Sequence, residues 1–130
     1  MKIRIYYEDT DCGGIVYHAN YLKYCERARS EWFFTLGLSP QDKEVGFVVK
    51  SMQIEFLHPA KLGDLLEVKT KILELKSASI LLEQEIFLQE KKIFSATILL
   101  VCIKLGENKI PKITKIPAFA NEIFKNLQKD

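Results

Sequence analysis

The sequence predicts an α+β domain in which antiparallel strands are backed by one long helix. Residues 20–37 carry apolar side chains every three or four positions, which is the spacing of a helix with a buried face. Four later stretches alternate apolar and polar residues or run almost wholly apolar, as strands do. Short turns separate these stretches, and short turns join antiparallel neighbours. With a further strand at the start of the chain, the predicted antiparallel sheet has about five strands.

The length of the chain, 130 residues, suits a single domain, which we assign to residues 1–130. Hydrophobic residues make up 48% of the sequence and charged residues 28%, which is the composition of a globular protein. The sequence contains no internal repeat, linker or low-complexity segment. One core therefore has to accommodate every predicted element.

The first predicted strand covers residues 2–7, KIRIYY, which alternate and are rich in residues that favour strands. A loop is predicted over residues 8–19, with Gly13 and Gly14 as its least constrained point. This loop leads directly into the long helix. Its side chains are therefore expected close to the helix N-terminus.

The helix predicted over residues 20–37 has an apolar face that is wider than a surface helix needs. Asn20 is the candidate N-cap, and Gly37 is the candidate for the residue just past the C-cap. The apolar positions are Tyr21, Leu22, Cys25, Ala28, Trp32, Phe33, Phe34 and Leu36. We expect this helix to be covered on several sides.

The remaining chain predicts four strands and a short terminal helix. The strands are expected in residues 47–60, 65–75, 80–89 and 93–105, and the helix in residues 117–129. The last strand, IFSATILLVCIKL, is almost wholly apolar, which is typical of a strand covered on both faces at the centre of a sheet.

Charge and targeting signals narrow the function classes. Lys and Arg number 19 against 17 Asp and Glu, so the formal net charge is only +2, too balanced for a nucleic-acid binder. We see no secretory signal and no apolar run long enough to span a membrane. Three cysteines at unrelated spacings are expected to be reduced thiols in a cytoplasmic protein, namely Cys12, Cys25 and Cys102.

The stretch YYEDTDCGGIVYHANY, residues 6–21, gathers two aspartates, a cysteine, a Gly-Gly pair and a histidine before the helix. A helix N-terminus presents unpaired N–H groups that stabilise an oxygen as it becomes an anion. A carboxylate beside such a site supplies the base or nucleophile for acyl transfer. The alternative is that loop aspartates only cap turns or helix ends. These residues alone do not choose between Asp9 and Asp11.

The evidence for other kinds of site in this stretch, such as a metal site or a phosphate-binding loop, is weaker. His18 is as well explained by a structural hydrogen bond as by a catalytic part. The spacing of Cys12, His18 and Cys25 matches no zinc pattern, and neighbouring carboxylates oppose a thiolate at Cys12. The Gly-Gly pair lacks the lysine of a phosphate-binding loop. We therefore expect no metal and no cofactor.

The segment YYEDTDCGGIVYHANYLKYCERAR is similar to a known family, and FLHPAKLGDLLEV fits the strand-turn-strand that follows in that family. The sequence resembles the hotdog-fold acyl-CoA thioesterases of the 4-hydroxybenzoyl-CoA thioesterase group. The match covers nearly the whole chain and is closest to the YbgC-type, Tol–Pal-associated branch. This resemblance implies a hotdog fold, in which the antiparallel sheet of about five strands wraps around one long central helix.

The resemblance also implies roles for loop residues. It places the catalytic carboxylate at Asp11, as nucleophile or general base, and makes the backbone N–H of His18 the group that polarises the thioester carbonyl. Whether the imidazole of His18 takes part stays open. Tyr7 is expected to bond Asp11 or the substrate, and Asp9 to have a turn or capping role.

The implied substrate is an acyl-CoA, with thioesters of acyl carrier protein as an alternative. The phosphates of CoA are expected to meet lysines of the later strands and turns; the candidates are Lys61, Lys76, Lys91 and Lys92. The helix aromatics either belong to the core or line an acyl pocket, and they are Tyr21, Tyr24, Trp32 and Phe33. Family members associate side by side, so we expect at least a homodimer and, further, a tetramer built from two dimers.

Two competing functions remain at this point. A hotdog hydratase or dehydratase would carry an Asp-x4-His pair on the helix, whereas Asp11 and His18 are seven residues apart. A non-catalytic acyl-carrier or envelope-complex binding module would keep the fold without chemistry, and the intact Asp11 argues against it.

Overall fold

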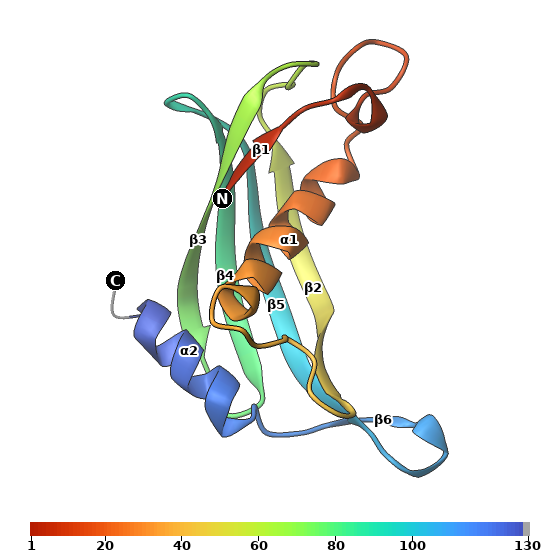
Figure 1. The fold of residues 1–130 in the computed structure, drawn as a ribbon, viewed down its shortest axis with the longest axis vertical. Helices are drawn as coiled ribbons and strands as arrows, with labels where there is room; N and C mark the ends of the chain where they lie inside the picture. The colour runs from red at the N-terminus through yellow and green to blue at the C-terminus, as the bar shows by residue number, and fades with distance from the viewer. Residues whose placement is uncertain (129–130) are drawn as a thin grey trace.

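The computed structural model describes residues 1–128 and consists of a curved antiparallel sheet with two α-helices (Figure 1). The strands pair in the order β1-β3-β4-β5-β2, and β6 pairs with the end of β5. The elements are β1 (Lys2–Arg4), α1 (Asn20–Phe34), β2 (Val45–Phe56), β3 (Leu65–Leu75), β4 (Ser79–Leu88), β5 (Lys91–Leu105), β6 (Pro111–Ile113) and α2 (Ala118–Gln128). Short 3₁₀ turns cover Tyr7–Asp9 and Glu107–Lys109.

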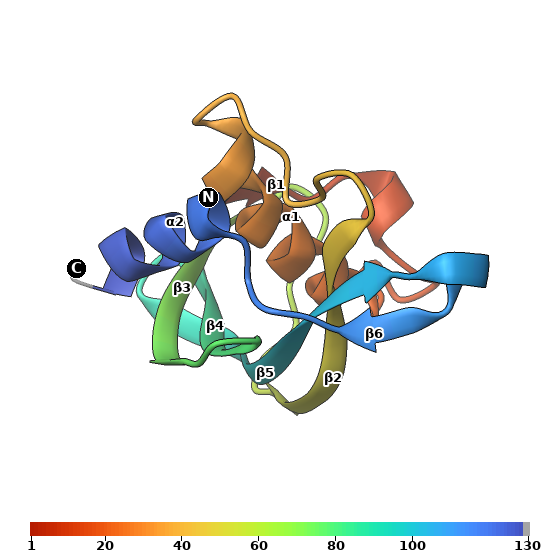
Figure 2. The same ribbon diagram turned by 90° about the horizontal axis from the view of Figure 1, so that it is seen from below.

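The sheet curves around α1, which lies across its concave face (Figure 2). The buried residues of α1 are Asn20, Tyr21, Tyr24, Cys25, Ala28 and Phe33, and they pack into one core with the inward side chains of the sheet and of α2. A sheet wrapped around one helix confirms the predicted α+β hotdog fold. The sheet has six strands where about five were predicted, because β6 is only three residues long and shows no alternation.

Helix α1 begins at Asn20 as predicted and ends three residues before the predicted end. Asn20 is the first helical residue and Ala19 takes the N-cap position, so the prediction of Asn20 as N-cap was wrong. Gly37 adopts a left-handed φ of +73°, but the C-cap is Thr35, so Gly37 lies two residues past the C-cap and not directly after it as predicted. Leu36 lies past the last helical turn and is 61% exposed, which takes it out of the buried stripe.

Strand β1 is shorter than predicted, covering residues 2–4 and not residues 2–7. The backbone N–H of Tyr6 donates to the Asp9 carboxylate at 2.9 Å, and the chain turns into the 3₁₀ segment that begins at Tyr7. A local side-chain acceptor thus replaces the sheet partner that Tyr6 would need.

Strand β2 covers residues 45–56 where residues 47–60 were predicted, because its pairing with β5 ends at Phe56 and Pro59 has no N–H to donate. The next three strands match the prediction closely. Strand β3 has the predicted bounds, and β4 and β5 differ from theirs by one or two residues at their starts and ends. Strand β5 lies between β4 and β2, the central place expected of its apolar sequence. Helix α2 is confirmed over residues 118–128, while Lys129, also in the predicted helix, lies outside the described residues.

Strand β2 forms one edge of the sheet, because it pairs only with β5 within residues 1–128. It spans twelve residues. Three of its apolar side chains are strongly exposed: Val48 at 44%, Val49 at 43% and Phe56 at 53%. A bulge at Lys50 interrupts its pairing with β5. No helix in the described part of the chain is long and apolar enough to cross a membrane.

Candidate active site

The loop before α1 folds back on itself as a small closed turn, seen beyond the upper end of α1 in Figure 1. A bridge pairs Thr10 with Val16, and inside it the N–H of Asp11 donates to the Ile15 carbonyl at 3.0 Å. The N–H of Gly14 donates back to the Asp11 carbonyl at 3.0 Å, with Gly14 at a φ of +75° that suits glycine. The Gly-Gly pair therefore makes the tip of a defined turn, with Asp11 at its base.

The loop is held against the turn that follows β2. The N–H of Val16 donates to the Ala60 carbonyl at 2.9 Å, and a bridge pairs Ile15 with Lys61. Ala60 is fully buried, and its N–H donates to the hydroxyl of Tyr21 at 3.2 Å. The core thus supports the loop from beneath and leaves its outer side open.

Asp11 is exposed, and its carboxylate is almost unoccupied. Oδ1 accepts the backbone N–H of Gly13 at 3.2 Å, and no other donor within residues 1–128 reaches either oxygen. A carboxylate with open lone pairs at the surface is available to a water molecule or to a substrate carbonyl.

Asp9, two residues earlier, is engaged on both carboxylate oxygens. Oδ1 accepts the hydroxyl of Tyr24 at 2.7 Å, and Oδ2 accepts the backbone N–H of Tyr6 at 2.9 Å. These contacts fit the turn and capping role predicted for Asp9. They leave Asp11 as the carboxylate of the pair that faces solvent.

His18 lies two residues before the first helical residue, Asn20. Its backbone N–H lies just outside the helix, before the N-cap Ala19, and donates to no acceptor of the described chain. The imidazole is exposed, lies 4.6 Å from the ring of Tyr17 and meets the ring of Phe56 edge-on at 6.1 Å. The unpaired N–H and the carboxylate of Asp11 therefore belong to the same short loop.

The structure does not bring Tyr7 to Asp11. The side chain of Tyr7 is 81% exposed, and within residues 1–128 its hydroxyl makes no hydrogen bond. Tyr7 belongs to the 3₁₀ turn and not to the end of β1, because the chain leaves the sheet before reaching it. Any contact of Tyr7 would have to be with a substrate or another chain.

Two of the four candidate lysines, Lys61 and Lys76, lie at opposite ends of the sheet. Lys61 pairs with Ile15 beside the loop, so its side chain starts next to the Gly-Gly tip. Lys76 follows β3 in the turn to β4, at the far end of the sheet from the loop (Figure 1), and forms a 3.1 Å ion pair with Glu74. Of the two, only Lys61 lies beside the loop that carries Asp11.

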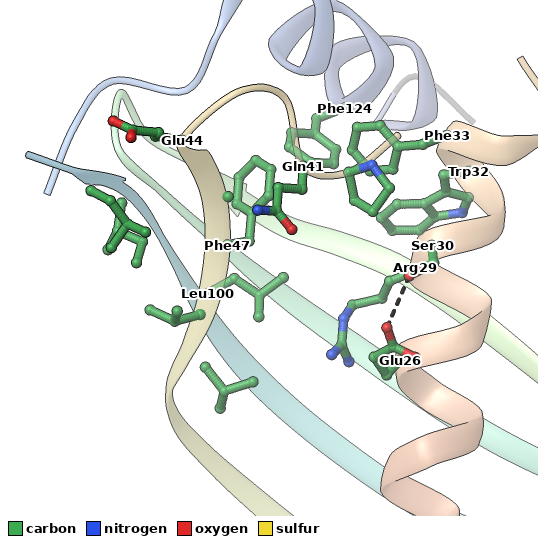
Figure 3. A pocket seen from close by; sticks show the side chains of 16 residues that line it. Glu26, Arg29, Ser30, Trp32, Phe33, Gln41, Glu44, Phe47, Leu100 and Phe124 are labelled. Carbon is green, nitrogen blue, oxygen red and sulfur yellow. Dashed lines mark hydrogen bonds between the residues drawn. The ribbon is translucent and has the colours of Figure 1, made fainter. Parts of the chain in front are cut away.

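A pocket of about 380 Å³ lies between the second half of α1, the start of β2 and Phe124 of α2 (Figure 3). Trp32 and Phe33 line it from the helix, and Phe47 lines it from β2. The sequence left the helix aromatics open between core and pocket, and the structure divides them. Tyr21 and Tyr24 are buried in the core and do not line the pocket, half-buried Trp32 lines it, and Phe33 belongs to the core and also lines it. The loop residues that hold Asp11 and His18 do not line it.

A buried polar network behind this pocket was missed by the sequence analysis. Gln84 of β4 is fully buried, accepts the guanidinium of Arg29 at 2.9 Å, and donates to the Cys25 carbonyl and to Thr70, both at 3.0 Å. Burial lowers the pKa of Arg29. Period-two alternation places Gln84 on the same face as apolar Leu82 and Ile86, and one polar residue on that face was the available signal.

The cysteines do not gather around Asp11. Cys12 is exposed in the loop, whereas Cys25 and Cys102 are buried and all three are free thiols. Burial raises the pKa of Cys25 to about 12, so this thiol stays protonated at neutral pH. Within residues 1–128, no group of three or more His, Cys, Asp or Glu side chains is arranged to hold a metal ion.

Comparison with known proteins identifies a family and several similar sequences. The family model of the Thioesterase superfamily matches residues 13–94, beginning two residues after Asp11. The acyl-CoA thioesterase YbgC of Helicobacter pylori is 54% identical over 87 residues, which are 67% of this chain and 65% of that protein, just under two thirds of its length. The acyl-CoA thioesterase YbgC of Haemophilus influenzae is 44% identical over 113 residues, covering 84% of this chain and 83% of that protein.

A solved structure supports the fold as well. The crystal structure of a probable thioesterase from Bartonella henselae is 34% identical, with a TM-score of 0.78, and covers 90% of this chain and 97% of that one. The sequence match and the shared fold point to the same group of proteins. The chain belongs to the thioesterase superfamily.

Proposed function

We propose that this protein is an acyl-CoA thioesterase that hydrolyses acyl-CoA to a free acid and CoA. The observation that carries the proposal is that one closed loop holds both the Asp11 carboxylate, which accepts only the N–H of Gly13 within residues 1–128, and the N–H of His18, which has no acceptor there. A carbonyl placed between them would meet an acceptor on one side and a donor on the other. The names of the YbgC relatives support acyl-CoA as the substrate class.

Two reaction routes fit this pair. In the nucleophilic route, an oxygen of Asp11 bonds to the thioester carbon, the carbonyl oxygen becomes an anion held by the His18 N–H, and CoA leaves as a thiolate. Water then hydrolyses the mixed anhydride and restores Asp11. In the general-base route, Asp11 takes a proton from water as the water oxygen attacks, and that proton passes to the departing sulfur.

The routes differ in where the oxygen of water can end. In a single turnover in ¹⁸O-water, a mixed anhydride that water attacks at Cγ of Asp11 leaves ¹⁸O in the Asp11 carboxylate, whereas attack of water on the acyl carbon, in either route, places it only in the released acid. Label in Asp11 therefore identifies the nucleophilic route. Mass spectrometry of the peptide that contains Asp11 reads this difference directly.

Lys61 is our candidate for the CoA phosphates, because its backbone pairs with Ile15 of the loop. Lys76 remains a proposal with less support, since it lies at the far end of the sheet and pairs with Glu74. We also propose acyl carrier protein as an alternative thioester carrier, a cytoplasmic location, and Tyr7 as a substrate contact. The high exposure of Tyr7 is compatible with that contact.

The working enzyme is proposed to be at least a homodimer joined along β2. The outer edge of β2 has no partner within the described chain, and Val48 and Val49 are exposed beside it. Antiparallel pairing of two β2 edges about a two-fold axis perpendicular to the sheet would make the two copies of α1 run in opposite directions. The end of one α1 would then lie at the same side of the dimer as the start of the other. The pocket of one copy would then lie near the Asp11 loop of the other, and two such dimers would make the tetramer.

The test of the proposed function is thiol release from short, long and aromatic acyl-CoAs, followed with DTNB. The exposed thiol of Cys12 is open to reaction with DTNB, which would add to the signal from released CoA. The Cys12→Ser variant removes this contribution of the protein itself. We expect saturable release that is lost in Asp11→Asn. Absence of release across the whole panel would overturn the proposal and favour a binding module, and addition of water across an enoyl-CoA would favour a hydratase.

A further inference from the structure

Asp9 ties the base of the loop to α1 through its main chain as well as its side chain. Its carbonyl oxygen accepts the side-chain amide of Asn20 and the backbone N–H of Tyr17, both at 2.9 Å. Its carboxylate accepts the hydroxyl of Tyr24 at 2.7 Å and the N–H of Tyr6 at 2.9 Å. Four donors therefore converge on one residue, which lies two positions before Asp11.

The helix end of this arrangement is rigid. Asn20 and Tyr24 are one turn apart on α1, so both face the same side and reach Asp9 together. Both are buried, with Tyr24 only 1% exposed. Burial and the neighbouring Asp9 carboxylate raise the pKa of Tyr24, so its phenol keeps its proton and remains the donor.

The contact between Tyr17 and Asp9 closes the base of the loop, next to the bridge between Thr10 and Val16. Residue 17 returns to Asp9 through its backbone N–H, and His18 follows directly. Asp11 therefore lies shortly after Asp9, and His18 directly after Tyr17, the two residues that this contact joins. A displacement of Asp9 would change the separation between the carboxylate of Asp11 and the N–H of His18.

We propose that Asp9 and Tyr24 are positioning residues for thioester hydrolysis, holding the carboxylate of Asp11 opposite the N–H of His18. This inference rests on the proposed function. The bond between Asp9 and Tyr24 is charge-assisted and partly shielded from water, which makes it stronger than a neutral hydrogen bond. Its effect on rate comes through geometry, because a shift of about 1 Å at a reacting group costs up to about a hundredfold in rate.

Tyr24→Phe removes only the hydroxyl that bonds Asp9 and leaves the buried ring. We expect kcat to fall by about 10- to 100-fold while KM changes by less than about threefold. The matched control is Tyr21→Phe, which removes a neighbouring buried hydroxyl that accepts from Ala60 and does not touch Asp9. That variant should keep kcat within about threefold of the wild type, even where its melting temperature falls as far as that of Tyr24→Phe.

Asp9→Asn weakens the same contact from the other side, because the amide carries no charge and turns its NH₂ group toward one of the two donors that the carboxylate accepts. If the two residues act as one unit, the double variant Asp9→Asn with Tyr24→Phe should lose no more kcat than the more affected single variant. Independent losses that multiply would contradict a shared positioning role.

Amide hydrogen exchange gives a readout that does not depend on activity. The N–H groups of Tyr6 and Tyr17 both donate to Asp9, so Tyr24→Phe should speed their exchange by about tenfold while Leu82 in β4 keeps its rate. In Tyr21→Phe all three should exchange as in the wild type. Unchanged exchange at Tyr6 and Tyr17 in Tyr24→Phe overturns the inference, whatever the enzyme does.

The kinetic results separate this inference from the proposed function. An active wild type with full turnover in Tyr24→Phe overturns the positioning role and leaves Asp11 chemistry standing. Equal losses of kcat in Tyr24→Phe and Tyr21→Phe reduce Tyr24 to general stability, which also overturns it. A wild type that releases no thiol overturns the proposed function, and the exchange experiment then still decides whether Tyr24 fixes the loop.

Discussion

The hydroxyl of Tyr24 lies 2.7 Å from Oδ1 of Asp9, whereas the carboxylate of Asp11 meets only the backbone N–H of Gly13 within residues 1–128. The two aspartates of one D-x-D segment are therefore in opposite situations. Asp9 is occupied and connects the loop to the helix. Asp11 is open and faces outward, where a substrate can approach it.

Asp11→Asn should abolish hydrolysis without harming the fold. The amide keeps the shape of the side chain but supplies neither a nucleophile nor a base, so kcat for thiol release should fall by about 10³-fold or more. Because Asp11 is exposed and accepts one weak bond, the melting temperature should stay within about 2 °C of the wild type. Wild-type turnover in this variant would remove Asp11 from the mechanism.

His18 can be tested by separating its backbone from its side chain. His18→Ala keeps the N–H and should retain activity within about tenfold, whereas His18→Pro removes the donor and should lower kcat by about 10²- to 10³-fold. Activity is measured by thiol release, and melting temperatures show whether the proline disturbs the helix start. Equal losses in the two variants would assign the role to the imidazole.

The two glycines of the loop should differ in their tolerance of a side chain. Gly14 has a φ of +75°, so Gly14→Ala should cost about 1 kcal/mol in the free energy of unfolding. Gly13→Ala is the matched control, because its Cβ would meet Oδ1 of Asp11 at an ordinary 3.8 Å and its φ is not positive. Urea denaturation compares the variants, and a larger loss for Gly13→Ala would contradict the turn geometry.

Stability should fall at alkaline pH through Cys25. The folded state raises the pKa of this thiol from 9.0 to about 12 by burial, so above pH 9 the unfolded chain releases a proton that the folded chain keeps. This contribution is fully present below the unfolded pKa of Cys25 and is lost at up to about 1.4 kcal/mol per pH unit as pH rises toward its folded pKa. The raised pKa of Tyr24 acts in the same direction at higher pH.

Urea denaturation at pH 8 and pH 10.5 checks this expectation. Cys25→Ala should be less stable at pH 8 because it leaves a small cavity, but it should lose less stability than the wild type between the two pH values. Cys12→Ser, which removes an exposed thiol, should keep the wild-type pH dependence. An unchanged slope in Cys25→Ala would show that other groups govern alkaline unfolding.

Periodicity predicted most of the fold because each long element buries one face. Helix α1 and strands β3 to β5 follow their patterns closely, since their apolar side chains all enter one core. The misses have local causes. Strand β1 ends early because Asp9 supplies an acceptor to Tyr6, a contact that no propensity describes. Strand β6 is too short to show a pattern.

The site was predictable in part. The residues indicated a carboxylate beside a helix start, and the family resemblance selected Asp11. What the sequence did not reveal was the contact of Tyr24 with Asp9, because an apolar-face position on a helix gives no sign of a polar partner fifteen residues away. Lys76 was placed with the substrate by residue type alone, and topology carries it to the other end of the sheet.

The buried contact between Arg29 and Gln84 has a consequence for strand pairing. A slip of β4 by one residue would turn Gln84 outward and bring a neighbouring residue, Glu83 or Glu85, beneath the helix. The guanidinium would then lose its amide acceptor, and the Cys25 carbonyl and the Thr70 hydroxyl would lose their donor. Purely apolar positions would tolerate many packings, but this one polar contact is satisfied in a single alignment of the strands. Gln84 therefore favours the native register of β4 over alignments that are shifted by one residue while the chain folds.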